Sequence, residues 1–362
     1  MYQGLIIKHM EFKDIKNIQM LSEFLGIDQD YFETFISSPY VVCKQGESKV
    51  KREKSSYLQI KIPKVNRKNE YRIVYEVINN KILTPQKELQ SRLNKLYKTP
   101  DCVHGFVHGK NIRSNASAHL AKKIILKIDI KNFFESISLE QVAFVFQELG
   151  CSLDISIMIA KLVTLNGNLV AGFVTSPVIA NLALISMDNE LNSIYCNDKY
   201  NYTRYADDIT ISSNYECPDI NKIESIINTY GFKLNKSKTL ISLRGQRQYV
   251  TGLTVFDNIR PRISKRYKRN LRLQIYYLKK HGVTKEALYM LGISREEYEE
   301  NEIIKSSVRS YAMGKFRNLK GKIDFINSVE PILAKKLYKE IYKSLDISDE
   351  ISDILQEPCR TN

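Results

Sequence analysis

Three aspartates carry the clearest chemical signal in this sequence. Asp207 and Asp208 are adjacent within a β-prone run, and Asp129 closes an earlier apolar run that starts at Ile124. Each carboxylate therefore falls at the end of a predicted strand or in a hairpin turn, where side chains from different strands meet. Hard oxygen ligands that converge in this way suit two Mg²⁺ ions and an in-line phosphoryl displacement. The pattern predicts nucleotidyl transfer, with all three aspartates as catalytic residues.

The same residues predict a site for two metal ions. Asp129 and Asp207 are the expected ligands of two Mg²⁺ ions, which Mn²⁺ could replace. Asp208 adds negative charge beside them and either ligates directly or only transiently, and the backbone carbonyl of Ile130 is a natural further ligand. A plainer interpretation is that Ala206-Asp207-Asp208 is a polar hairpin turn, since Asp is favoured in turns. The pairing with Asp129 favours the metal site.

The alternation and capping patterns predict the elements that must position these residues. We expect strands at 71–77 and 124–130, hairpins at 202–212 and 232–243, and a strand pair at 249–255 and 258–263. We expect helices at 83–97, with Pro85 in the first turn, and at 114–121, 139–149 (capped by Ser138), 151–165, 176–195 and 219–230. Residues 1–60 read as helical, and helices return from Ser264 to about Leu345.

This order of elements predicts the fold class. A β-α-β-β core carries the aspartates, a mixed region precedes it and a basic helical region follows it. We expect an α+β right-hand polymerase with fingers, a palm built as an antiparallel sheet backed by helices, and a helical thumb. The expected domains are a helical N-terminal extension (1–60), fingers and palm (61–256), a basic helical thumb (257–345) and a C-terminal tail (346–362).

Composition narrows the class of partner. The chain has 362 residues, a net charge of +15 and a pI of about 9.3, which favours binding to a polyphosphate backbone over an ordinary basic surface once the aspartates are considered. Its apolar stretches are too short to span a bilayer and its N-terminus lacks a basic leader, so we expect a cytoplasmic protein with no membrane partner. Six scattered cysteines without a C-x-x-C pair argue against a zinc knuckle or a disulfide framework.

Several motifs resemble those of bacterial retron-type reverse transcriptases. The run from Asp129 to Ile137 resembles the family's first aspartate motif, and Tyr205-Ala-Asp-Asp208 resembles its catalytic box. Gly172–Asn181 matches the family's central Gly-x-x-Thr-Ser-Pro-x-x-Ala-Asn motif, and Gly231–Thr239 matches the palm motif that follows it. Two shorter elements also match, Asn-Ala-x-x-His at Asn115–His119 and Val-Thr-Gly at Val250–Gly252. The resemblance extends from about Arg72 to Pro331, which is most of the chain.

The resemblance implies residues that bind the incoming deoxynucleotide. Phe134 resembles the steric gate that excludes a ribose hydroxyl, although Phe133 and Phe134 could both be core. Arg72 and Lys110 resemble the basic residues of the fingers that hold the triphosphate, although surface cations are usually just solvated. Lys238 resembles the palm lysine that protonates the leaving pyrophosphate, and Lys236, on the same face of a predicted strand, competes for this role.

The resemblance also implies residues that recognise RNA. The Asn-Ala-x-x-His element (Asn115, His119) and the Val-Thr-Gly element (Val250, Thr251, Gly252) serve either the fold or RNA recognition. The basic segment Ser264–Lys280 predicts a thumb helix that follows a nucleic-acid backbone, with interleaved tyrosines for stacking or packing. Its alternative is a solvated helix face. The thumb residues expected to contact RNA are Lys265, Arg266, Lys268, Arg269 and Arg272.

By resemblance, the chain is an RNA-directed DNA polymerase that copies a cognate structured non-coding RNA. Synthesis would start from a 2′-hydroxyl of a guanosine in that RNA and give a branched RNA–DNA hybrid, in an antiphage system with a separate effector protein. The alternatives are another bacterial defence or abortive-infection reverse transcriptase and an inactive RNA-binding scaffold; a group II intron maturase fits less well. One departure is Ala171, which replaces a Gln usual in relatives and puts substrate contacts, rate or fidelity in question.

Overall fold

The computed structural model describes residues 10–38, 41–64 and 69–342. The chain divides into two compact units, Met1–Gln246 and Arg247–Asn362, and each is described by itself. The predicted C-terminal tail lies outside the described residues. Along the described part of the chain, no helix is both long and apolar enough to cross a membrane.

The first unit contains the predicted antiparallel palm sheet. Its strand order is β5-β6-β4-β7, formed by Tyr200–Tyr205, Asp208–Ser213, Ile124–Asp129 and Leu240–Leu243. Every neighbouring pair in this sheet is antiparallel. Ile125, Leu126 and Ile128 of β4 are buried, which explains why this strand reads as a nearly continuous apolar run. The sheet therefore places the carboxyl end of β4 beside the β5–β6 turn.

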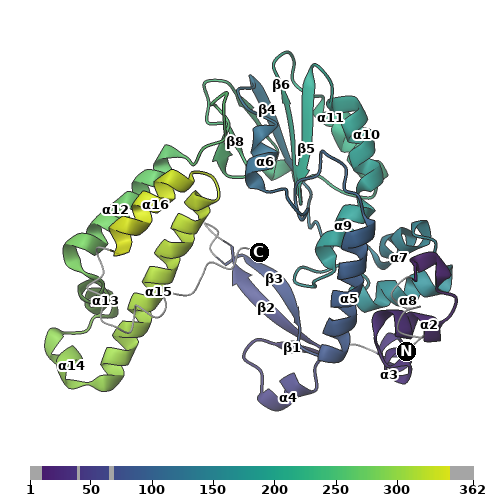
Figure 1. The fold of residues 1–362 in the computed structure, drawn as a ribbon, viewed down its shortest axis with the longest axis horizontal. Helices are drawn as coiled ribbons and strands as arrows, with labels where there is room; N and C mark the ends of the chain where they lie inside the picture. Colours follow the sequence, from purple (N-terminus) through teal and green to yellow (C-terminus); the bar gives the residue numbers. More distant parts are fainter. Residues whose placement is uncertain (1–9, 39–40, 65–68, 343–362) are drawn as a thin grey trace. The chain divides into compact units, whose positions relative to one another are not determined.

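Helices cover this sheet and extend its core. They are α7 (Leu139–Glu148), α8 (Leu153–Val163), α9 (Ser176–Ala183), α10 (Ile185–Tyr195) and α11 (Ile220–Thr229). Figure 1 shows α10 and α11 lying together beside β5. The Ser138 cap is confirmed as a capping box with Gln141, but the single helix expected at 176–195 breaks at Leu184, where ψ rises to 2°. The N-cap of α9 is Thr175.

A second sheet spans the predicted N-terminal extension and the start of the predicted fingers. Strands β1 (Val42–Lys44), β2 (Tyr57–Pro63) and β3 (Tyr71–Val77) lie in this order, with β1 parallel to β2 and β2 antiparallel to β3. The prediction that residues 1–60 are all helical is therefore wrong. The run Tyr57-Leu-Gln-Ile-Lys-Ile alternates and is rich in β-formers, and it pairs along its whole length with the confirmed strand 71–77. The helices of this stretch are η1 (Phe12–Asp14), α2 (Ile18–Leu25), α3 (Gln29–Ser37) and α4 (Lys49–Glu53).

Three other predicted boundaries need correction. Helix α5 (Asn80–Leu96) begins with an Asn79 cap, so Pro85 lies inside the helix rather than in its first turn, and α6 (Ile112–Ser117) is shorter than expected. The hairpin expected at 232–243 is wrong, because Lys236–Lys238 forms a 3₁₀ helix, η2, and β7 pairs with β4. A local hairpin thus gives way to a pairing between segments that are distant in sequence.

The second unit begins with a short strand pair and continues as helices. Strands β8 (Tyr249–Val250) and β9 (Leu253–Thr254) form the pair. The longer pair expected between 249–255 and 258–263 is reduced to a single bridge between Thr254 and Arg262. The helices are α12 (Lys265–His281), α13 (Val283–Leu291), α14 (Arg295–Glu300), α15 (Glu302–Asn327) and α16 (Pro331–Tyr342). Buried residues from α12, α15 and α16, such as Leu271, Leu319 and Leu337, supply the apolar interior of this unit.

Candidate active site

The β5–β6 turn presents the adjacent aspartates. Tyr205 and Asp208 are opposite each other in the register, so Ala206 and Asp207 form a two-residue turn between the strands. Ala206 has a φ of 56°, in the left-handed region that residues other than glycine rarely adopt. The Asp207 side chain is half-buried and Asp208 is exposed. The turn thus projects both acidic residues from the end of the hairpin.

Asp129 lies beside this turn. It is the last residue of β4 and is directly opposite Asp208 in the β4–β6 register. The backbone N–H of Ile130 donates to the carbonyl oxygen of Asp207 at 3.0 Å, which joins the end of β4 to the turn. The sheet therefore brings the three aspartates together, although Asp129 is distant from the other two in the sequence.

Two donors hold the carboxylate of Asp129. Lys238 Nζ lies 2.6 Å from Oδ1 and Asn235 Nδ2 lies 3.1 Å from Oδ2. The backbone N–H of Asn235 also donates to the carbonyl oxygen of Asp129 at 2.8 Å, while Ser237 Oγ donates to Asn235 Oδ1 at 2.8 Å. Asn235 is thus a site residue to which we had given no role. Its position within the Gly231–Thr239 motif was the signal that could have identified it.

The electrostatics of the site favour a cation. Desolvation raises the pKa of Asp207, and the charge of Asp129 raises it further, against the opposing effects of Lys238 and Arg72. Desolvation, followed by the charges of Asp207 and Asp129, raises the pKa of Asp208 to about 6. Like-charged carboxylates that repel one another in this way are stabilised when a cation binds between them.

The donor set fits hard divalent cations, but it is not pre-assembled. In the described segments, no three His, Cys, Asp or Glu side chains converge into a ready metal cluster. Both carboxylate oxygens of Asp129 already accept hydrogen bonds, from Asn235 and Lys238. A cation at Asp129 must therefore compete with the ammonium group of Lys238. Carboxylate oxygens remain the ligand type that Mg²⁺ prefers.

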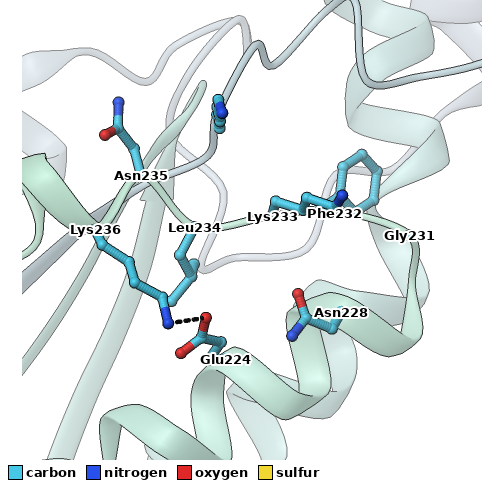
Figure 2. Close-up of a pocket in the computed structure, with 9 residues that line it drawn as sticks. Glu224, Asn228, Gly231, Phe232, Lys233, Leu234, Asn235 and Lys236 are labelled. Atoms are coloured by element: carbon cyan, nitrogen blue, oxygen red, sulfur yellow. Dashed lines mark ion pairs between the residues drawn. The ribbon is translucent and has the colours of Figure 1, made fainter.

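The structure distinguishes between the two candidate palm lysines. Lys236 and Lys238 lie in the 3₁₀ helix η2, so the expectation that they share a strand face is wrong. Lys238 contacts Asp129, whereas Lys236 forms an ion pair with Glu224 of α11 at 2.9 Å (Figure 2). With three residues per turn, a 3₁₀ helix points the side chains of residues two positions apart in different directions, whereas a strand points them to the same face.

A cavity of about 620 Å³ lies next to this 3₁₀ helix. Figure 2 shows it between α11 and the segment from Gly231 to Lys236. Three lysines, Lys131, Lys233 and Lys236, line it together with the Glu224 carboxylate. The cavity is therefore basic overall, and it adjoins the active site through Asn235, which lines the cavity and holds Asp129.

The proposed cations of the fingers differ in their surroundings. Arg72 of β3 is exposed and close enough to lower the pKa of Asp207 through its charge. The Lys110 ammonium is 2.8 Å from the carbonyl oxygen of Asp101 and 3.6 Å from its carboxylate, and it also reaches the carbonyl oxygen of Pro100 at 3.4 Å. Arg72 is thus open to a triphosphate, whereas Lys110 is engaged in holding its own loop.

Phe134 lies beside other aromatic rings near Asp129. Residues 131–136 form turns and no strand, with Asn132 at a φ of 51°. Phe133 is nevertheless buried and Phe134 is half-buried, with ring centroids 5.1 Å apart. The ring of Phe106, 47% exposed and absent from our expected site, lies 6.1 Å from that of Phe134. Together they give the site an apolar margin.

The Asn-Ala-x-x-His element serves the fold. Asn115 and His119 are completely buried, so the assignment of direct RNA contacts to them is corrected. The two ring nitrogens of His119 lie 2.7 Å from Ser212 Oγ and 2.8 Å from Thr203 Oγ1. Desolvation lowers the pKa of His119 to about 3, which keeps the ring neutral. His119 thus links β5 to β6, the two strands of the aspartate hairpin.

The RNA-binding residues predicted in the second unit also divide by exposure. Val250 is buried, which excludes a direct contact of its side chain with RNA, while Thr251 and Gly252 form the turn after β8 with φ of 44° and 81°. Lys268 is largely buried and bonds to Glu330 at 3.0 and 3.1 Å. Four of the predicted thumb cations are exposed, namely Lys265, Arg266, Arg269 and Arg272.

Comparison with known proteins identifies the family. Residues 62–293 match the family model described as reverse transcriptase (RNA-dependent DNA polymerase). This chain belongs to the reverse transcriptase family. The family match confirms the predicted α+β right-hand polymerase fold, with its antiparallel palm sheet and accompanying helices.

Several curated relatives are retron reverse transcriptases. The chain is 30% identical over 278 residues to the retron Se72 reverse transcriptase of Salmonella heidelberg (strain 579083-10), covering 74% of this chain and 69% of that protein. It is 27% identical over 312 residues to the retron Ec83 reverse transcriptase of Escherichia coli, covering 81% and 89%. The match to the retron Mx65 reverse transcriptase of Myxococcus xanthus is 33% identical and spans 47% of this chain and only 45% of that relative. The chain is therefore a retron-type reverse transcriptase, an RNA-directed DNA polymerase.

One solved structure aligns over most of the chain. It is that of telomerase from Candida albicans in complex with the TWJ fragment of telomeric RNA. The alignment covers 94% of this chain and 68% of that chain, at 12% sequence identity and a TM-score of 0.41.

Proposed function

We propose that this reverse transcriptase copies a cognate structured non-coding RNA into DNA, with Asp129, Asp207 and Asp208 as its catalytic carboxylates. The observation that carries the proposal is the β4–β6 register, which places Asp129 opposite Asp208 and next to the Asp207 turn. Carboxylates gathered at one end of a sheet supply the hard oxygen donors that phosphoryl transfer requires.

The proposed cofactor is a pair of Mg²⁺ ions, with Mn²⁺ as a substitute. Asp129, Asp207 and Asp208 would hold them, with the carbonyl oxygen of Ile130 as a further ligand. Bound there, such ions would lower the pKa of the primer hydroxyl and neutralise charge on the triphosphate. Lys238 pairs with Asp129 and is partly exposed, and it would leave Asp129 for the phosphates and protonate the departing pyrophosphate.

The fingers and the aromatic margin would select the nucleotide. Arg72 offers a planar guanidinium that can bind the triphosphate oxygens in bidentate fashion, which a lysine cannot do. The half-buried ring of Phe134 would lie beneath the sugar and exclude a ribose 2′-hydroxyl. Lys110 would contribute only after leaving the Asp101 carbonyl that it now contacts.

The proposed template and primer are parts of one RNA. The similarity to retron enzymes supports synthesis from a guanosine 2′-hydroxyl, a branched RNA–DNA product, and a role in antiphage defence with a separate effector protein. The exposed cations of α12 suit an RNA backbone, because phosphate contacts give affinity independently of base sequence. A cytoplasmic location accords with this role.

Primer extension tests the catalytic assignment. The purified protein, with an annealed RNA template and DNA primer, dNTPs and Mg²⁺, should extend the primer. Asp207→Asn should abolish extension, whereas Asp198→Asn, an exposed substitution before β5, should not. Extension by Asp207→Asn at the wild-type rate would contradict the assignment, and an inactive wild type would favour the RNA-binding scaffold.

A second experiment separates the retron from another defence reverse transcriptase. Nucleic acid that co-purifies with the protein should contain DNA joined to RNA through a 2′,5′ linkage at a guanosine. Treatment with a debranching enzyme should release the DNA 5′ end. DNA without attached RNA, or DNA attached to protein, would favour the alternative enzyme class.

A further inference from the structure

A buried arginine contacts the backbone of the catalytic turn. Arg204, on β5, is completely inaccessible to solvent, and its NH1 donates to the carbonyl oxygen of Ala206 at 3.1 Å. That carbonyl belongs to the peptide unit that joins Ala206 to Asp207. The arginine thus bonds to the backbone immediately before a proposed catalytic carboxylate.

The other side of the guanidinium is fixed by Asp188 of α10. Arg204 Nε lies 2.8 Å from Asp188 Oδ1, and NH2 lies 2.6 Å from Oδ2. Asp188 is also completely buried, and it accepts a further hydrogen bond from the hydroxyl of Tyr202 at 2.7 Å. This bidentate pairing orients the planar guanidinium and directs NH1 towards the turn.

Asn181 of α9 adds a second connection to the turn. Its Oδ1 accepts from Arg204 NH1 at 3.2 Å, and its Nδ2 donates to the carbonyl oxygen of Gly105 at 3.0 Å. Gly105 lies against the turn so closely that a Cβ atom there would be only 2.2 Å from the backbone nitrogen of Ala206. The segment around Gly105 also pairs with β5, since His104 N–H donates to the Arg204 carbonyl oxygen at 2.8 Å.

These contacts surround a backbone conformation that needs support. Ala206 occupies the left-handed region with a φ of 56°, which is unfavourable for a residue with a Cβ atom. The Arg204 bond on the Ala206 carbonyl and the Gly105 backbone against the Ala206 nitrogen restrain both peptide units that flank this residue. The conformation of Ala206 in turn sets where the Asp207 side chain points.

We propose that Arg204, oriented by Asp188 and connected to Gly105 through Asn181, is a positioning residue that fixes the Ala206–Asp207 turn for metal binding. This inference rests on the proposed catalytic role of Asp207. Arg204 itself touches neither substrate nor metal, because its guanidinium is enclosed by Asp188, Asn181 and the Ala206 carbonyl.

The test measures the Mg²⁺ concentration that gives half-maximal primer extension. Arg204→Lys keeps a positive charge for Asp188 but cannot also reproduce the bonds to Asn181 and Ala206. We expect this variant to need about tenfold more Mg²⁺, as loss of a buried charged hydrogen bond implies. Its kcat should fall, while its affinity for the primer–template should not change.

Tyr202→Phe is the matched control, because it removes a buried hydrogen bond to Asp188 while it leaves the groups that bond to Arg204 in place. It should lower the melting temperature but leave the Mg²⁺ requirement at the wild-type value. Gly105→Ala is the second variant, since it leaves the Arg204–Asp188 pair intact and pushes directly on Ala206. Like Arg204→Lys, it should raise the Mg²⁺ requirement. It can therefore test the proposal if Arg204→Lys does not fold.

Two results would overturn the proposal. One is a wild-type Mg²⁺ requirement in folded Arg204→Lys or, should that variant not fold, in Gly105→Ala. The other is an equal increase in Tyr202→Phe, which would indicate that loss of stability alone causes the effect. Failure of the catalytic assignment itself is distinguishable, because Asp207→Asn would then retain activity whatever the turn variants do.

Discussion

Substitution of Lys238 by methionine should lower both kcat and the Mg²⁺ concentration that gives half-maximal activity. The substitution keeps the length of the side chain and removes the ammonium that lies 2.6 Å from Asp129 Oδ1. This ammonium competes with a cation for Asp129. Without it, metal binding becomes easier, but the leaving pyrophosphate loses its proposed proton donor.

The magnitudes follow from exposure and chemistry. The Lys238 side chain is 45% exposed and that of Asp129 is 8% exposed, so solvent weakens the pair to the range of about 0.5–1 kcal/mol measured for surface pairs. The Mg²⁺ concentration for half-maximal activity should therefore fall about two- to fivefold. Loss of a general acid should lower kcat by about 10²-fold or more.

Single-nucleotide incorporation under pre-steady-state conditions, measured over a range of Mg²⁺ concentrations, gives both kcat and the Mg²⁺ concentration for half-maximal activity. Lys236→Met is the matched control, because Lys236 is paired with Glu224 instead of Asp129. It should leave both parameters close to their wild-type values. A Lys238→Met enzyme with unchanged kcat would refute the role in protonation, and an increased Mg²⁺ requirement would refute the competition between the ammonium and the metal.

Three further outcomes are expected. Phe134→Ala should raise ribonucleotide incorporation relative to deoxynucleotide about tenfold or more, in a competition assay; unchanged selectivity in an active enzyme would remove the steric gate. The pKa of His119, about 3 when folded, lies below the ordinary 6.5, so its contribution to stability is complete above pH 6.5 and is lost as pH falls towards 3. Urea unfolding of His119→Gln should therefore show a shallower fall in the free energy of unfolding over this range, with a remaining slope from His104, whose pKa is lowered to about 4. Arg269→Ala should reduce the slope of log RNA affinity against log salt by about 1, whereas Lys268→Ala, which loses the bond to Glu330, should not.

The parts of the site that could be predicted depend on local signals. The Asp207 turn follows from polar residues between two β-prone runs, and the Ser138 cap from a serine followed three residues later by a glutamine. The meeting of Asp129 with Asp208 required a further step, that the run before Asp129 is a central strand. Its nearly continuous apolar sequence supplied that step.

The errors arise where partners are distant in sequence. Residues 240–243 look like the second strand of a local hairpin, yet they pair with β4, more than a hundred residues earlier. The strand β2 was missed within the presumed helical extension because its stability comes from pairing with β3. Lys236 was placed beside Lys238 by a strand alternation that a 3₁₀ turn does not follow. Pairing across the sheet, which no local pattern contains, decides each of these cases.

The burial of three residues in the two short motifs changes where RNA recognition must be sought. Asn115, His119 and Val250 are inaccessible, so His119 can influence RNA only through the hairpin strands that it links, and Val250 only through the β8–β9 turn. A buried histidine that links Thr203 to Ser212 is as useful to any enzyme with this hairpin, whatever RNA it copies. Discrimination of a cognate RNA requires groups that reach solvent. Under the proposed function, the exposed cations of α12 meet that requirement, and such cations contact phosphate more readily than bases. Selection of the RNA by this chain should therefore depend more on the shape of its backbone than on its base sequence.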